Sequence, residues 1–119
     1  MSDFIFESLE IWKYAVEVTI KLLEIADLLD NKKLYGFANQ LRNSSLSITS
    51  NIAEGSGSFS DKDFGVFLNY SRRSVFECAN IILVLYFKNY IKEEIKLQRL
   101  SELDILSKRI TAFRRSLKH

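Results

Sequence analysis

The stretch SDKDFGVFLNYSRRSVFECANIILVLYFK, residues 60–88, decides the fold. Its apolar and small side chains recur at alternating steps of four and three residues, the spacing of a heptad seam on one helix face. The positions on this seam are Phe64, Leu68, Ser71, Val75, Cys78, Ile82 and Leu85. Ser60 can accept hydrogen bonds from backbone N–H groups of a first turn, and Asp61 and Asp63 complement the positive end of a helix dipole. The spacing therefore predicts a helix over residues 60–88.

Three further segments have the same rhythm, and each predicts a helix. Their apolar stripes run through Leu9, Trp12, Val16, Thr19, Leu23 and Ala26 in residues 8–30, through Leu34, Ala38, Leu41, Ser45, Ile48 and Ile52 in residues 34–54, and through Leu100, Leu103, Leu106, Ile110, Phe113 and Leu117 in residues 92–117. Gly55 continues the stripe of the second segment, and its small residues Ala38, Ser45 and Gly55 are expected to let a neighbouring helix approach closely. Gly55-Ser56-Gly57 also tolerates positive φ and is expected to cap this helix and turn the chain. Long helices joined by short loops predict an all-α fold: one antiparallel up-down-up-down four-helix bundle over residues 1–119.

The composition fits one globular domain and excludes much enzyme chemistry. The chain has 119 residues, 47% of them hydrophobic and 27% charged, and it contains no proline. Its single cysteine, Cys78, and single histidine, His119, cannot build a disulfide framework, a Cys/His zinc site or a histidine-dependent triad. No nucleophile, base and orienting group converge from any spacing in the chain. We therefore expect no enzyme activity, no metal and no cofactor.

Neither a secretion signal nor a membrane span is visible. The N-terminus carries an acid and lacks the basic, apolar and small-residue order of a signal peptide. The longest apolar run, residues 81–87, falls well below the eighteen or so residues that indicate a membrane span. We expect a cytoplasmic protein that does not enter membranes.

The third helix has apolar side chains left over on the face opposite its seam. These side chains are Val66, Phe76, Leu83, Val84 and Phe87. In a small bundle they would form an exposed patch unless another subunit covers them, so the pattern favours self-association. The alternative is that this helix is more central than a symmetric bundle suggests.

Charge is distributed unevenly along the chain. Residues 1–30 have a net charge of −5 and residues 91–119 a net charge of +4. The basic end of the last helix contains Lys108, Arg109, Arg114, Arg115 and Lys118. These bases can contact nucleic-acid phosphates, and a ring of identical subunits would multiply the patch. Alternatively they complement the helix dipole and attract the acidic first helix through Glu10, Glu17, Glu24 or Asp27.

Several motifs resemble a known family. They are Gln40-Leu41-Arg42, Ser47-Ile48 and Asn51-Ile52-Ala53-Glu54-Gly55, with Phe6-x-x-Leu-x-Ile-Trp12-x-x-Ala15 before them and Phe64-x-x-Phe67-Leu68-x-x-Ser71-x-x-Ser74-x-x-Glu77 after them. Together they resemble the four-helix-bundle proteins encoded in intervening sequences of bacterial 23S ribosomal RNA genes. Many members have a proline where this chain has Thr49, and a second base where it has Asn43. The absence of that second base weakens any basic patch on this helix.

The resemblance implies a left-handed bundle that forms ring-shaped homopentamers and has no catalytic activity. Related accessory proteins of diversity-generating retroelements bind nucleic acid and a reverse transcriptase through basic surfaces. The resemblance thus implies RNA or DNA, or a protein such as a reverse transcriptase, as partners. A protein-binding oligomeric scaffold with no nucleic-acid role is the alternative function.

Two residue groups lie near the matched motifs. Arg42, Arg72 and Arg73, with Tyr70 beside the arginine pair, could combine phosphate contact with aromatic stacking, or could form solvated helix surface. The second group is polar, and we expect it to form one hydrogen-bonded network that fixes the register of two helices. Its members are Asn51, Glu54, Ser71 and Ser74.

Overall fold

The structure, a computed structural model, describes residues 2–118 and is a four-helix bundle of about 44 × 26 × 21 Å. A short 3-10 helix, η1 (Ile5–Ser8), precedes α1 (Glu10–Asn31), α2 (Tyr35–Ser56), α3 (Asp61–Phe87) and α4 (Glu93–Ser116). Each α-helix begins and ends within two residues of its predicted segment, and the all-α up-down arrangement is confirmed. The sequence analysis did not anticipate η1. His119 lies outside the described residues.

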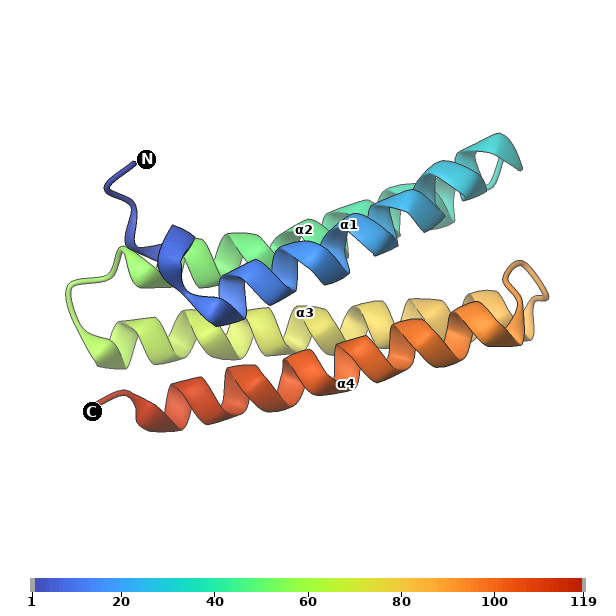
Figure 1. The fold of residues 1–119 in the computed structure, drawn as a ribbon. Helices are drawn as coiled ribbons and strands as arrows, with labels where there is room; N and C mark the ends of the chain where they lie inside the picture. The colour runs from blue at the N-terminus through green and yellow to red at the C-terminus, as the bar shows by residue number, and fades with distance from the viewer. Residues whose placement is uncertain (1, 119) are drawn as a thin grey trace.

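The bundle has two layers, α1 with α2 and α3 with α4 (Figure 1). The described chain ends and the α2–α3 loop lie at one end of the bundle, and the α1–α2 and α3–α4 loops lie at the other. This arrangement places the first half of α3 beside the second half of α4. No helix within residues 2–118 is both long and apolar enough to cross a bilayer.

The predicted seam of α3 faces the core. Leu68, Val75, Cys78, Ile82 and Leu85 are buried there, together with large side chains of the other three helices. Two buried hydroxyl groups also cross between helices. The Oγ1 of Thr19 donates to the carbonyl oxygen of Ser45 at 3.1 Å, and the Oγ of Ser71 donates to that of Ile48 at 2.8 Å. Both bonds end on α2, which is therefore fixed to α1 on one side and to α3 on the other.

The two roles predicted at the end of α2, a helix cap and a close helix approach, fall on different glycines. Gly57 caps the helix with φ of −84°, and no described glycine has a positive φ. Gly55 instead lies buried inside α2, where a Cβ atom would stand 2.7 Å from the Cβ of Phe67 on α3. It allows two helices to approach closely. The left-handed conformation occurs at Lys33 and Asn89, with φ of 62° and 63°, each just after a helix.

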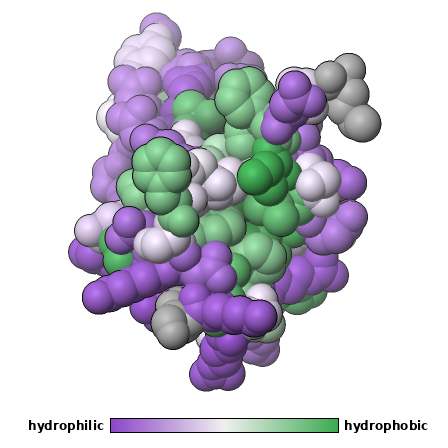
Figure 2. All heavy atoms as spheres, turned by 90° about the vertical axis from the view of Figure 1, so that its left-hand side faces the viewer, coloured by the Kyte–Doolittle hydropathy of each residue, from purple (hydrophilic) through white to green (hydrophobic). Residues whose placement is uncertain are grey.

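Apolar side chains gather at the end of the bundle that holds the α2–α3 loop (Figure 2). In η1, the ring of Phe6 packs 5.0 Å from that of Trp12, which explains why the chain folds back onto the start of α1. Phe4 and Ile5 remain largely exposed, and Phe59 in the loop is fully exposed. This end is therefore only partly covered by its own chain.

Candidate functional site

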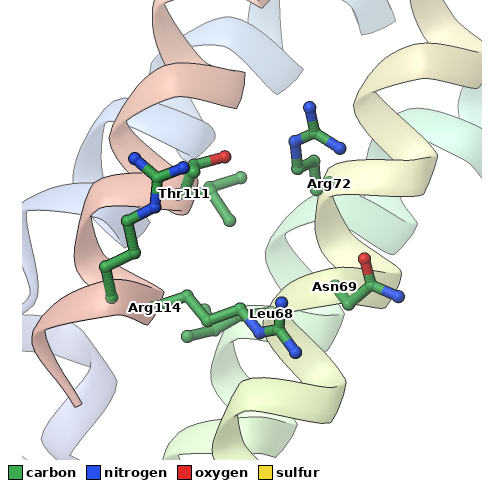
Figure 3. A pocket seen from close by; sticks show the side chains of 7 residues that line it. Leu68, Asn69, Arg72, Thr111 and Arg114 are labelled. Carbon is green, nitrogen blue, oxygen red and sulfur yellow. The ribbon is translucent and has the colours of Figure 1, made fainter.

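Three of the predicted basic residues meet in one groove between α3 and α4. Arg72 of α3 and Arg114 and Arg115 of α4 line a hollow of about 600 Å³, and Figure 3 shows Arg72 and Arg114 on either side of it. Asn69 and Thr111 add neutral hydrogen-bonding groups. We call this hollow the arginine groove.

The seams of the two helices explain why these side chains meet. Leu68 and Ile110 are core residues that contribute to the floor of the groove. Residues three and four positions further along a helix lie close to the same face, displaced towards its flank. Arg72 therefore flanks Leu68, Arg114 flanks Ile110, and the antiparallel α3–α4 pair brings the two flanks together.

The arginine groove has an uncompensated positive charge. Six ion pairs form within residues 2–118, and none of them uses Arg72, Arg114 or Arg115. The lining also contains no carboxylate. Arg72 contacts the ring of Phe76, with its guanidinium carbon 4.8 Å from the ring centroid. Three guanidinium groups thus face one hollow from two helices without an acidic partner there.

Three other predicted basic residues are engaged inside the monomer. Arg42 bridges Asp27, at 2.8 Å, and Asp30, both on α1. The hydrogen bonds that it donates to Asp30, and then to Asp27, raise the pKa of Arg42. Lys108 pairs with Asp104 at 2.8 Å on its own helix. Arg109 lies over the ring of Tyr14 with its guanidinium carbon 4.4 Å from the centroid.

The last two predicted basic residues lie apart from the arginine groove. Arg73 lines a separate polar hollow of about 340 Å³ between α2 and α3, beside Tyr70 and Glu77. The backbone N–H of Lys118 donates to Asp61 at 3.0 Å, which places Lys118 beside the start of α3. The eight predicted residues are therefore not one surface.

The predicted ion pairs between the acids of α1 and the basic end of α4 are wrong. Asp27 pairs with Arg42 of α2, and Glu10 pairs with Lys13 on its own helix. Glu17 and Glu24 form no ion pair within residues 2–118. The ion pair that does join α1 to α4 lies at mid-helix and has the opposite polarity, with the base on α1 and the acid on α4. The carboxylate of Glu102 accepts a hydrogen bond from the Nζ of Lys21 at 2.5 Å and lies 2.8 Å from the Nε of Arg99.

The expected polar network of Asn51, Glu54, Ser71 and Ser74 does not form. Asn51 donates to the Ser47 carbonyl and Ser74 to the Tyr70 carbonyl, in each case one turn earlier on the same helix. Glu54 is exposed, and its carboxylate accepts no hydrogen bond within residues 2–118. Such back-bonding satisfies an amide or hydroxyl group on a helix flank without a partner helix. Only Ser71 crosses to α2. The sequence analysis missed the other polar link, from the hydroxyl of Ser44 to Glu77 at 2.6 Å.

The apolar face of α3 opposite its seam is largely exposed to solvent. Val66, Phe76, Val84 and Phe87 are exposed, whereas Leu83 is partly buried. Phe76 lies on the flank of this face nearest α4, beneath Arg72. Val66, Val84 and Phe87 are the members that extend along the outside of the helix.

The described residues offer little for metal or nucleophilic chemistry. Within residues 2–118, no group of three or more His, Cys, Asp and Glu side chains is placed to hold a metal ion. Cys78 is buried on the seam of α3, and burial raises the pKa of its thiol to about 12. A thiol with that pKa is a poor nucleophile at neutral pH.

Comparison with known proteins identifies the family. The family model for the 23S rRNA-intervening sequence protein matches residues 7–112, which include Arg72 and end before Arg114. No curated protein matches the chain significantly. Among solved structures, the chain is similar to a protein with unknown function from the S23 ribosomal protein family of Bacteroides thetaiotaomicron, with a TM-score of 0.84 and 20% identity over 89% of this chain and 99% of that one. That likeness shows a shared fold. Because the family model spans most of its length, the chain belongs to the 23S rRNA-intervening sequence protein family.

Proposed function

We propose that the protein is a non-catalytic nucleic-acid-binding protein that holds the phosphate backbone of RNA or DNA in the arginine groove. The observation that carries the proposal is the convergence of Arg72, Arg114 and Arg115 from two helices on one hollow without a carboxylate in its lining. Guanidinium groups have a planar fork of donors that matches phosphate oxygens.

The structural alternative explains only part of this arrangement. Arg114 and Arg115 lie in the last turn of α4, where bases complement the helix dipole. Arg72 lies in the interior of α3, far from any helix end, and gains nothing from the dipole. Like charges also repel when they share a hollow, so the third arginine favours an anionic ligand over a purely structural role.

Self-association through the outer face of α3 is the second part of the proposal. Val66, Val84 and Phe87 are exposed apolar side chains on a helix whose opposite face is already buried. A closed ring, such as the homopentamer that the family resemblance implies, would repeat the arginine groove around one assembly. Several weak phosphate contacts made by one strand would then add through effective concentration.

A protein-binding scaffold is the second candidate function. The observation that favours it is the apolar end of the bundle, where Phe4, Ile5 and Phe59 are exposed. A protein partner bound there would be held mainly by apolar contact, so its affinity would respond little to salt.

Fluorescence anisotropy with labelled RNA and DNA oligomers tests the first candidate between about 50 and 200 mM salt. We expect saturable binding that weakens steeply with salt. Arg114→Ala with Arg115→Ala should lower the affinity at least about tenfold and reduce the salt slope by about two, because each lost phosphate contact removes about one unit of slope.

The matched control is Lys88→Ala with Lys92→Ala, which removes two positive charges at the opposite end of the bundle. We expect this variant to bind nearly as well as the parent. Absence of binding at the lowest salt, or equal losses from both double variants, would overturn the proposal and favour the scaffold.

A further inference from the structure

A second hollow lies next to the arginine groove, further along α3. This hollow, of about 210 Å³, lies between the same two helices and is lined mainly by apolar side chains. Its walls include Val75, Phe76 and Ala79 of α3, and Leu100 and Leu103 of α4. Ser107 and Asp104 also line it, and the carboxylate of Asp104 is paired with Lys108 at 2.8 Å. We call it the Phe76 hollow.

The two hollows meet at a contact between two side chains. Arg72 lines the arginine groove, Phe76 lines the Phe76 hollow, and the guanidinium carbon of Arg72 lies 4.8 Å from the ring centroid of Phe76. The two residues are four positions apart, about 6 Å along the helix axis. On α4, Ser107 of the Phe76 hollow precedes Thr111 of the arginine groove by the same step. One ligand of modest size can therefore occupy both.

The two hollows are lined by side chains of different chemical character. At one end, three guanidinium groups suit an anion. At the other, an aromatic ring that is 56% exposed stands beside aliphatic side chains and suits a flat apolar group. Arg72 lies between them and offers both a charge for the anion and a planar face for stacking. A nucleotide has these two parts, a phosphate and a planar base, in adjacent positions.

We propose that the α3–α4 groove binds one unpaired nucleotide unit, with its phosphate on Arg72, Arg114 and Arg115 and its base against Phe76. This inference rests on the proposed phosphate-binding function and adds the state of the ligand, a single strand or a free nucleotide in place of a duplex. In a duplex the bases are stacked and expose only their edges in the grooves. An unpaired base can leave the strand and stack on an aromatic side chain, whatever its identity.

The test compares two single strands that carry the same charge, with and without bases, and a duplex that carries about twice that charge. The probes are a labelled oligothymidylate of about 12 nucleotides, an abasic oligomer of the same length, and a duplex of the same length, all at about 50 mM salt. We expect the oligothymidylate to bind about tenfold more tightly than the abasic oligomer, because stacking adds to phosphate contact. The duplex should bind less tightly than the oligothymidylate, although it carries more phosphates, because its bases are not free to stack on Phe76.

Variants of Phe76 separate stacking from charge. Phe76→Ala should remove most of the advantage of the oligothymidylate over the abasic oligomer, whereas Phe76→Tyr should retain that advantage. Phe59→Ala is the matched control, because that ring is fully exposed and lies in the α2–α3 loop. It should change neither affinity.

The outcomes distinguish this inference from the function on which it rests. Equal binding of the thymidylate and abasic oligomers, or a duplex preference unaffected by Phe76→Ala, would overturn the base site and leave phosphate binding intact. Binding of no probe would overturn both. Displacement of the oligothymidylate by thymidine monophosphate would assign the site to free nucleotides, and failure of that competitor would assign it to nucleotides within a strand.

Discussion

Gly55 of α2 lies directly against Phe67 of α3. A Cβ atom on Gly55 would stand 2.7 Å from the Cβ of Phe67 and 2.8 Å from a ring carbon of Phe64. The Phe64 ring can rotate, but the Cβ of Phe67 is fixed to its backbone. The two helices therefore approach each other here at a distance that only glycine permits.

Replacement Gly55→Ala should lower the free energy of unfolding by about 1–3 kcal/mol, because the added methyl group must push α2 and α3 apart. Urea denaturation measures this loss. Gly36→Ala is the control, since a Cβ atom at Gly36 meets nothing within 4 Å and its φ is not positive. That change should be neutral or stabilise the protein by about 0.4–1 kcal/mol. Equal stability of both variants would show that the helix contact at Gly55 can relax.

The small residues on the α2 seam predicted that a helix approaches Gly55 closely, but they did not identify Phe67 as the partner. Heptad spacing predicted the four helices and the buried seams of α2 and α3, because an apolar stripe follows from local periodicity. On α1, only Thr19 and Ala26 of the predicted stripe are buried, and the core face is centred on other residues such as Val18 and Leu22. Which side chain lies against Gly55 depends on how the two helices are rotated and shifted against each other. No pattern within one helix specifies that relationship.

The arginine groove was predictable only in outline. Arg72 and the pair Arg114 and Arg115 formed two separate candidates in the sequence, although an antiparallel hairpin brings the start of α3 beside the end of α4. The exact register and the engagement of Arg42 and Arg109 by α1 decided which bases share the groove. Those contacts form between helices, so composition and charge counts do not reveal them.

The buried hydroxyl group of Ser71 should contribute measurably to the α2–α3 contact. Ser71→Ala removes the 2.8 Å hydrogen bond to the carbonyl of Ile48 and should lower the free energy of unfolding by about 0.5–1.5 kcal/mol. Ser74→Ala, on the same helix, removes only a bond to its own helix and should change stability by less than about 0.5 kcal/mol. Chemical denaturation of the two variants compares them directly, and equal losses would contradict a special role for the interhelical bond.

The thiol of Cys78 should make stability depend on pH in alkaline solution. Burial raises its pKa from 9.0 to about 12, so between these values the unfolded chain releases a proton that the folded chain retains. The stabilisation is therefore complete below about pH 9 and is lost as pH rises towards 12, by up to about 1.4 kcal/mol for each pH unit.

Comparison with Cys78→Ala isolates this effect from the titration of lysines and tyrosines. The parent should lose about 2 kcal/mol more than the variant when pH rises from about 8 to about 10.5. Unfolding free energies from urea titrations at the two pH values measure the difference. Equal losses of unfolding free energy in both proteins would contradict the prediction, because they would mean that the thiol ionises as readily in the folded protein as in the unfolded chain.

The outer face of α3 yields the last prediction, on assembly. Val84 and Phe87 are exposed, and Phe87 is 74% accessible in the monomer, whereas Leu83 beside them is partly buried. Val84→Glu with Phe87→Glu should therefore reduce the mass in solution to that of one chain while leaving the helical content unchanged. A charge at Leu83 would disturb the bundle itself and is unsuitable as a test.

Leu46→Glu serves as the control for this assembly, because Leu46 is an exposed apolar side chain on α2, away from that face. Light scattering should give the parent's mass for Leu46→Glu and the mass of one chain for the double variant. Only the double variant places charged groups in the apolar subunit contact, where they would have to lose their hydration. Retention of the parent's mass by the double variant, or a single-chain mass for the parent, would contradict self-association through α3. A loss caused by Leu46→Glu alone would move the subunit contact to α2.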